Sequence, residues 1–337
     1  MKFNTVILIP SYEPESSLVS FVKEIKESGF DILLVNDGSG KEYDEIFNSA
    51  APFTSYIKLE QNRGKGGALK EGFSALLKYY PNAKYVITAD GDGQHSLKDL
   101  IRINNLLEKE NEIIFGSREM EKMPTRSKIG NFLSKYDRTL LTKQYINDDQ
   151  CGLRGFQIRY LDELVAIDGN RYEYELRQII SFQLKNYKIL YMPIDTIYLD
   201  NNSKSHFTTV KDSLRLHISI FLYALPALIC NALLLASLLV CYQNGFTLYH
   251  LIIPILYLVA TALYFGVISL LYPSKKPIKR LLNEFLFCAL RATFVFLFVF
   301  LLSLIPGVSC LVLIPIGMFI ATAINYWVAL LKYKITK

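Results

Sequence analysis

Three oxygen-bearing side chains alternate with glycines in the run Asp90-Gly91-Asp92-Gly93-Gln94. Glycines let a loop bend tightly around an ion, and carboxylate and amide oxygens suit the hard cations Mg²⁺ and Mn²⁺. An EF-hand is excluded, because it would need Gly and Glu where His95 and Ile101 stand. The run therefore predicts a metal site made by Asp90, Asp92 and Gln94. An ordinary Asp-Gly turn is the alternative, and we interpret His95 as support for its neighbours.

A glycine-rich run at Asn62–Gly67 leads into a segment with helical periodicity. The N-terminus of a helix that follows such a loop can bind an anion, and Lys65 could reach a diphosphate. The run is not a Walker loop, because that pattern would need Gly at Leu59 and Ser or Thr at Gly66. A simple helix-capping turn is the alternative.

Four further polar residues have positions that suit a nucleotide or a phosphate. Asp37 follows an apolar segment and precedes Gly38, so it could bind the base of a nucleotide or form an Asx turn. Arg118, Arg126 and Lys128 flank a predicted loop. Arginine forks recognise phosphate well, although each of these side chains could instead be a solvated charge.

Short apolar segments alternate with amphipathic segments over the first 115 residues. This alternation predicts an α/β fold, with helices on both faces of a parallel sheet. Ligands of such sheets bind beyond the carboxyl ends of the strands, so we expect the runs above to line one cleft. The predicted strands are residues 5–9, 32–36, 56–59, 85–89 and 112–115, and the predicted helices are residues 15–28, 66–79 and 97–109.

Charge and cysteine content exclude several classes of protein. The net charge is +6, but eight of the 37 basic residues and only one of the 31 acidic residues lie in residues 217–337. The rest of the chain has no basic stripe, so a nucleic-acid partner is disfavoured. None of the five cysteines forms a CxxC pair, which disfavours a zinc site or a disulfide framework. The N-terminal apolar run is too short for a signal peptide.

Four apolar segments in the last 120 residues are each long enough to cross a bilayer. The link at residues 273–280 and the tail at 332–337 are basic, and the positive-inside rule places both in the cytoplasm. Four spans then place the N-terminal domain on the same side. The predicted spans are residues 218–241, 246–272, 281–305 and 307–331.

Glu284 and Arg291 both fall in the third apolar segment, seven residues apart and on one helix face. Ionisable groups inside a membrane span are rare and are often functional. Two interpretations stay open: a structural role, by pairing or by reaching the headgroups, and contact with a lipid phosphate.

Six motifs follow one another in a specific order: PSYEPE (10–15), NDGSG (36–40), NRGKGGALKEGF (62–73), DGDGQH (90–95), GSR (116–118) and DQCGLRGF (149–156). Over residues 4–215 this order resembles glycosyltransferase family 2, and within it the polyprenyl- or dolichyl-phosphate hexose synthases of the dolichyl-phosphate glucosyltransferase or mannose synthase type. The last 120 residues resemble the GtrA-like four-helix membrane family. Gly91 stands where relatives often have Ala, and RYEYE (171–175) matches the family pattern only loosely.

The resemblance implies a GT-A domain, which is Rossmann-like with a mostly parallel sheet. It would cover residues 1–205, followed by a juxtamembrane linker at 206–217 and an all-α membrane domain of four helices at 218–337. The donor nucleotide would be bound by Pro10, Tyr12, Glu13, Asp37, Asn62, Lys65 and Asp90. The metal would be bound by Asp90, Asp92 and Gln94, and the catalytic residues would be Asp92, Arg118, Arg126 and Asp148. Arg154, Glu173 and Glu175 lie, with Asp148, in a region that shapes the sugar and acceptor site of relatives.

These expectations describe a membrane enzyme that moves a hexose from a UDP-glucose-like or GDP-mannose-like donor to polyprenyl phosphate, with Mg²⁺ or Mn²⁺ and with inversion. A divalent metal stabilises the leaving diphosphate, and a lipid phosphate, already anionic, needs positioning more than deprotonation. The catalytic domain would face the cytoplasm at a bacterial plasma membrane. The alternatives are transfer to a hydroxyl of a glycan or glycolipid, with Asp148 or Asp149 as general base, and a non-catalytic flippase or scaffold. Homo-oligomers are compatible with the apolar helices.

Overall fold

The fold is taken from a computed structural model of the chain. Contacts between residues divide the chain into two compact units. The first unit comprises residues 1–132, 147–182 and 188–216, and the second comprises residues 133–146, 183–187 and 217–337. The structure describes residues 3–93, 95–110, 113–118, 139, 148, 151–195, 218, 221, 225, 229, 231–236, 249–271, 277–303 and 309–336.

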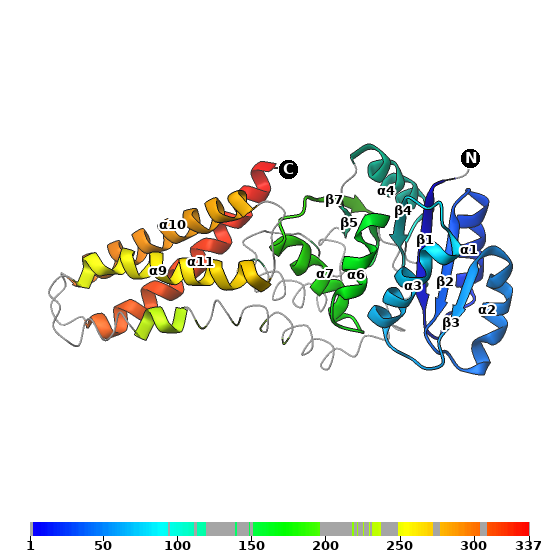
Figure 1. Ribbon diagram of the computed structural model, residues 1–337, viewed down its shortest axis with the longest axis horizontal. Helices are drawn as coiled ribbons and strands as arrows, with labels where there is room; N and C mark the ends of the chain where they lie inside the picture. The colour runs from blue at the N-terminus through cyan, green and yellow to red at the C-terminus, as the bar shows by residue number, and fades with distance from the viewer. Residues whose placement is uncertain are drawn as a thin grey trace. The chain divides into compact units, whose positions relative to one another are not determined.

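The first unit is built on a mostly parallel sheet, whose described strands follow the order β3-β2-β1-β4-β6-β5-β7 (Figure 1). β1 lies between β2 and β4, and all its side chains are buried, as its unbroken apolar run predicts. All five predicted strands are confirmed, each starting within one residue of its expected position. They are β1 (Thr5–Ser11), β2 (Asp31–Asn36), β3 (Ser55–Lys58), β4 (Tyr85–Thr88) and β5 (Ile113–Arg118).

Two further strands complete the sheet, and neither was predicted. β6 (Arg154–Gln157) runs antiparallel between β4 and β5, and β7 (Ile189–Ile194) runs parallel to β5. β6 is only four residues long and contains Gly155, where an added Cβ would lie 2.6 Å from Ile103 on a covering helix. The glycine therefore permits close packing of a helix on this strand.

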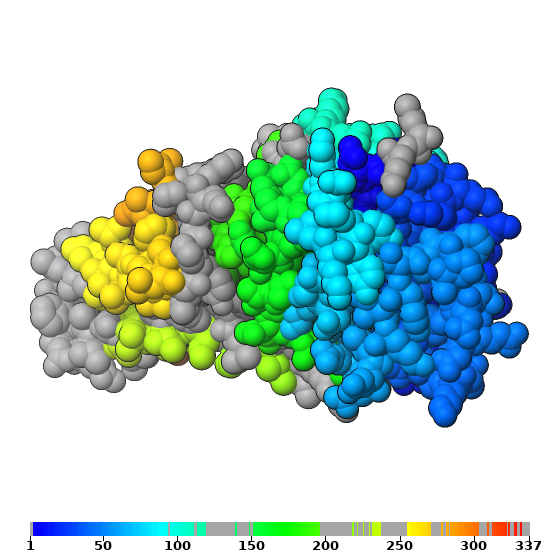
Figure 2. Space-filling view, turned by 45° about the vertical axis from the view of Figure 1, so that its right-hand side comes forward, coloured from blue at the N-terminus to red at the C-terminus, as the bar shows by residue number. Residues whose placement is uncertain are grey.

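Helices cover both faces of the sheet (Figure 1). α1, α2 and α4 pack into one apolar core with alternate residues of β1, and α1 buries Leu18, Phe21, Val22 and Ile25 at helical spacing. α3 packs on the other face of β1 and β2 and contacts α6, as the adjoining blue and green surfaces show (Figure 2). The helices are α1 (Ser17–Glu27), α2 (Asp44–Ala50), α3 (Lys65–Tyr79), α4 (Leu97–Glu110), α6 (Leu161–Ala166) and α7 (Glu173–Leu184).

The parallel strands present their carboxyl ends at one edge of the sheet. β1, β2 and β4 are mutually parallel, and β5 points the same way because both β4 and β5 are antiparallel to β6. The segment that enters β6 therefore starts at this same edge. The polar runs singled out in the sequence are thus brought together, as expected for a sheet of this class.

The second unit contains three long apolar helices among its described residues: α9 (Tyr249–Leu271), α10 (Pro277–Ser303) and α11 (Cys310–Thr336). They overlap three of the four predicted spans, while residues 218–241 lie largely outside the described part of the chain. Glu284–Leu302 in α10 is long and apolar enough to cross a membrane. Ile255–Leu270 and Val312–Ala321 are shorter apolar stretches.

The aromatic cluster around Phe156 provides a test of the fold of the first unit. Phe156 is fully buried, and its ring centre lies 6.3, 5.9 and 6.0 Å from those of Phe73, Phe115 and Phe182. We expect Phe156→Ala to lower the free energy of unfolding by about 3–5 kcal/mol, because the side chain is lost and a cavity remains. Urea denaturation followed by near-ultraviolet circular dichroism, to which the tyrosines of this unit contribute, would measure it.

Leu77→Ala serves as the control, since this side chain on α3 is 45% exposed. It should change the free energy of unfolding by about 0.5 kcal/mol or less. Equal effects of the two substitutions would contradict the position of Phe156 in the core.

Candidate functional site

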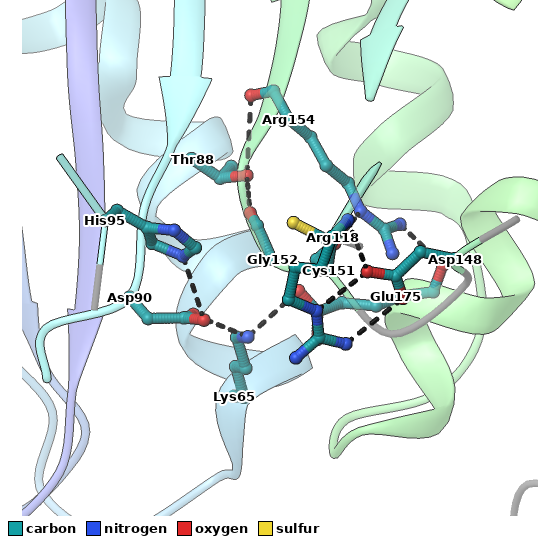
Figure 3. Close-up of polar contacts among 10 residues, drawn as sticks. All are labelled: Lys65, Thr88, Asp90, His95, Arg118, Asp148, Cys151, Gly152, Arg154 and Glu175. Atoms are coloured by element: carbon teal, nitrogen blue, oxygen red, sulfur yellow. Dashed lines mark hydrogen bonds and ion pairs between the residues drawn. The ribbon is translucent and has the colours of Figure 1, made fainter. Parts of the chain in front are cut away.

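Lys65 forms ion pairs with two carboxylates at the sheet edge (Figure 3). Its Nζ lies 2.6 Å from Oδ1 of Asp90 and 3.0 Å from Oε1 of Glu175. Lys65 is the first residue of α3, Asp90 follows β4, and Glu175 lies in the first turn of α7. One cation thus joins three segments that are far apart in the sequence.

The charges of this group stabilise one another. Burial alone would lower the pKa of Lys65, but the negative charges of Asp90 and Glu175 outweigh it and raise this pKa above its ordinary value. Burial would raise the pKa of Asp90, but Lys65 and a hydrogen bond with His95 hold it well below its usual range. Nε2 of His95 lies 3.2 Å from Oδ2 of Asp90. Both oxygens of Asp90 therefore have partners, and His95 supports this carboxylate as expected.

The glycines before and within α3 allow this arrangement by close packing. The backbone N–H of Gly67 donates to the carbonyl of Asn170 at 2.8 Å. An added Cβ at Gly66 would lie 2.4 Å from Cβ of Tyr174, at the start of α7. Any side chain at Gly66 would push α7 away from α3, and Lys65 would then lose its contact with Glu175.

A second ion pair lies at the carboxyl end of β5 (Figure 3). Nε and Nη2 of Arg118 donate to the two carboxylate oxygens of Asp148 at 2.7 and 3.1 Å, and the backbone N–H of Arg118 donates to the same carboxylate at 3.0 Å. The Asp148 side chain is fully buried, while that of Arg118 is 20% exposed. Asp148 therefore fixes the orientation of the guanidinium group. Arg126 and Lys128 lie outside the described residues.

Asp37 caps the loop that precedes α3. Its Oδ1 accepts a hydrogen bond of 2.7 Å from the backbone N–H of Arg63. Burial raises the pKa of this carboxyl, although the N–H groups of Arg63 and Gly64 favour its charged form. Gly38 (φ 72°) lies against the backbone of Asn62, where an added Cβ would come within 2.5 Å of its nitrogen. The loops that carry Asp37 and Asn62 therefore pack against each other.

The loop after β1 joins the same region. The backbone N–H of Glu13 donates to Oγ of Ser39 at 2.9 Å, and Glu13 has a positive φ of 49°. A hydrogen bond with Glu13 raises the pKa of Tyr12. Pro10 is buried at the end of β1 and lies opposite Val35 of β2. The residues predicted to bind the nucleoside therefore belong to neighbouring loops at one edge.

The loop after β4 has the donor chemistry for a divalent cation. Asp92 is exposed, and nothing among the described residues lies within 4 Å of a Cβ added at Gly93. Gln94 lies outside the described residues. Within the described part of the chain, no group of three or more His, Cys, Asp or Glu side chains could hold a metal ion. Asp90 and Asp92 fit Mg²⁺ or Mn²⁺ as a partial ligand set, completed by other oxygens.

Two residues that the resemblance placed near the sugar and acceptor make contacts inside the chain. Arg154 is 1% exposed, and its guanidinium group donates to backbone carbonyls. Oε1 of Glu173 accepts hydrogen bonds from the backbone N–H groups of Asn170 and Arg171 at 3.1 and 3.3 Å, before α7 begins. Gly152 lies beside Asp90 and Lys65 in the structure. Nothing in the sequence indicates this contact apart from the place of Gly152 in the motif DQCGLRGF.

Comparison with known proteins gives consistent matches. Residues 6–165 match the family model described as "Glycosyl transferase family 2". An uncharacterized protein of Methanocaldococcus jannaschii is 32% identical over 202 residues, which cover 58% of this chain and 82% of that protein. A UDP-N-acetylglucosamine–dolichyl-phosphate N-acetylglucosaminyltransferase of Methanococcus voltae is 30% identical over 217 residues, which cover 58% of this chain and 86% of that protein. A dolichyl-phosphate beta-glucosyltransferase of Dictyostelium discoideum is 30% identical over 185 residues, which cover 44% of this chain and 53% of that protein.

The shared lysine predicts a pH-dependent defect in Lys65→Met. In the parent chain the lowered pKa of Asp90 and the raised pKa of Lys65 keep this pair charged from about pH 5 to 9, so it adds no pH dependence there. Without the cation, the largely covered carboxylate of Asp90 binds a proton more readily in the folded state than in the unfolded state. Stability should then fall as pH rises, with a loss of about 3 kcal/mol near pH 8 and less near pH 5.

Urea denaturation across this pH range would measure the effect. Lys58→Met is the matched control, because Lys58 pairs with Asp44 at the exposed surface, 2.7 Å away. It should show little loss and no trend with pH. A Lys65→Met defect that is the same at both ends of the range would argue against the buried pair.

Proposed function

Because the chain belongs to glycosyl transferase family 2, we propose that it transfers a hexose from a nucleotide sugar to polyprenyl phosphate. The reaction is a single displacement that inverts the anomeric carbon, and it takes place at the cytoplasmic face of a membrane. Two similar proteins are named for transfer to dolichyl phosphate, which supports a lipid phosphate as acceptor. UDP-glucose, UDP-N-acetylglucosamine and GDP-mannose are the donors to test.

The observation that carries the proposal is the pair of ion-paired groups at one sheet edge (Figure 3). Lys65, with Asp90 and Glu175, supplies a cation for the diphosphate of the donor. Arg118, held by Asp148, supplies a fixed fork for the phosphate of the acceptor. Such an arrangement suits a reaction in which both substrates are phosphate esters and both need orientation.

The nucleoside is bound by the loops after β1 and β2. Asp37 and Asn62 face it from adjoining loops, and Pro10, Tyr12 and Glu13 complete the wall. Asp37 accepts a backbone hydrogen bond of 2.7 Å from Arg63, which holds its carboxylate in place for binding the base. Recognition by preformed loops limits the entropy lost on binding.

Asp90, Asp92 and Gln94 would hold Mg²⁺ or Mn²⁺. When bound, this ion neutralises charge that develops on the leaving diphosphate. The chain itself supplies the rest: Lys65 keeps the Asp90 carboxylate ionised and oriented, and His95 fixes its other oxygen. Asp92, exposed on the same loop, would be a ligand of this ion.

The second unit anchors the enzyme in the membrane. We propose four membrane helices within residues 218–337, after a catalytic domain at 1–205 and a linker at 206–217. Glu284–Leu302, which is long and apolar enough to cross a bilayer, supports this proposal. The basic link at residues 273–280 supports a cytoplasmic catalytic domain, because basic links stay on that side.

A transfer assay tests the proposed reaction. Purified protein in detergent is mixed with Mn²⁺ or Mg²⁺, short-chain polyprenyl phosphate and radiolabelled nucleotide sugars, and label in the organic phase is counted. We expect metal-dependent transfer from one donor, and a loss of about 100-fold or more in Asp92→Ala, because the charge of the leaving group is then less well stabilised. Asp162→Ala, exposed on α6, is the control. Transfer to a glycan hydroxyl but to no lipid would refute the acceptor class.

Arg118 provides a separate test of the acceptor site. We expect Arg118→Gln to raise KM for polyprenyl phosphate by about 10–100-fold and to leave KM for the donor unchanged, because a charge-assisted fork to the acceptor is lost. Arg159→Gln is a matched control, since Arg159 lies against Tyr160 at the end of β6 and outside the site. A larger change in donor KM than in lipid KM would assign Arg118 to the donor instead.

A further inference from the structure

The segment Cys151–Arg154, which leads into β6, lies between the two ion-paired groups (Figure 3). Oγ1 of Thr88 in β4 donates to the carbonyl of Gly152 at 2.7 Å. The Sγ of Cys151 would lie 3.0 Å from a Cβ added at Gly116, two residues before Arg118. Burial raises the pKa of the Cys151 thiol to about 12, so it remains neutral. The segment is thus fixed by the sheet on one side and packed near Arg118 on the other.

Gly152 lies where an added side chain would strike the ion pair of Lys65 and Asp90. A Cβ added there would lie 2.7 Å from both carboxylate oxygens of Asp90 and 2.7 Å from Nζ of Lys65. Real Cβ atoms essentially never come within 3.0 Å of other heavy atoms. Because the Thr88 hydrogen bond holds the backbone, the charged ends of Lys65 and Asp90 would have to move from these positions.

Arg154 ties the same segment to α7 from inside the protein. Its Nε donates to the carbonyl of Cys151 at 2.9 Å, and its Nη1 donates to the carbonyl of Glu175 at 2.6 Å and to Oε1 of Gln178 at 2.7 Å. The guanidinium carbon lies 4.7 Å from the ring centre of Phe115. This side chain is 1% exposed, so it acts on substrates only through the residues that it holds.

We infer that Gly152 and Arg154 are positioning residues of the transfer reaction. Gly152 leaves the space in which Lys65 reaches Asp90, and Arg154 sets the distance between this segment and Glu175. Together they fix the position of the Lys65 ammonium group, which binds the diphosphate of the donor. The inference rests on the proposed function, because it assigns Lys65 to the donor side.

Gly152→Ala in the intact protein tests the inference, and Gly155→Ala is its matched control. Both substitutions add one methyl group to the same stretch of chain, but the heavy atoms nearest to the methyl at residue 155 would be those of the apolar side chains Ile103 and Leu107. We expect Gly152→Ala to raise KM for the nucleotide sugar at least about tenfold and to lower kcat by up to about 100-fold, with KM for polyprenyl phosphate unchanged. Gly155→Ala should lower the unfolding midpoint and leave both KM values unchanged.

The split between the two KM values separates positioning from a general structural defect, which would lower the active fraction without changing KM. Identical kinetics of the two alanine variants would overturn the inference. Arg154→Lys, which keeps the charge but loses the fork, should also raise donor KM; if it does not fold, Gly152→Ala still decides. Arg159→Lys is its control.

Failure of the proposed function can be told apart from failure of this inference. If the parent protein transfers no label to lipid, binding of UDP and GDP with Mn²⁺ is measured by calorimetry instead. Gly152→Ala should then weaken nucleotide binding at least about tenfold relative to Gly155→Ala. Equal binding in both variants would overturn the positioning role whatever the acceptor.

Discussion

A single lysine shared between two carboxylates is the interaction on which the rest of the site depends. Lys65 lies 2.6 Å from Asp90 and 3.0 Å from Glu175, in a region where most of its side chain is covered. Removing one partner of a buried pair costs about 3–5 kcal/mol, because the other charge is left without compensation. The three segments that carry these residues are therefore constrained together, and so are the loops beside them.

This constraint explains why glycines gather around the lysine. Gly66 allows α7 to approach α3, and Gly152 allows the chain entering β6 to approach the ion pair. Each glycine removes a Cβ that would stand within 3.0 Å of a neighbour. The glycine-rich run that suggests a phosphate-binding loop is here a packing surface, and this packing uses the backbone N–H of Gly67, which donates to the carbonyl of Asn170.

The sequence predicts the parallel strands and the residues that follow them, because a buried apolar run that ends in Asp or Asn beside glycine is a local signal. This signal singles out Asp37 and Asp90, and Arg118 is singled out by its place at the end of a strand before a predicted loop. The strand β6 was not, since four residues that include Gly155 give no periodicity. Nor could the contact of Glu175 with Lys65 be predicted from spacing, because it depends on how α7 packs against α3, about 110 residues away.

The two ion-paired groups differ in a way that bears on the acceptor. Both carboxylate oxygens of Asp148 accept hydrogen bonds from Arg118, and its side chain is fully buried. To act as a general base toward a hydroxyl, Asp148 would have to take a proton and lose the negative charge that pairs with Arg118, which would leave this largely covered guanidinium group less well compensated. A phosphate oxygen needs no such base, and an oriented Arg118 attracts it directly. The geometry therefore favours an acceptor that arrives already charged over one that must be deprotonated at Asp148.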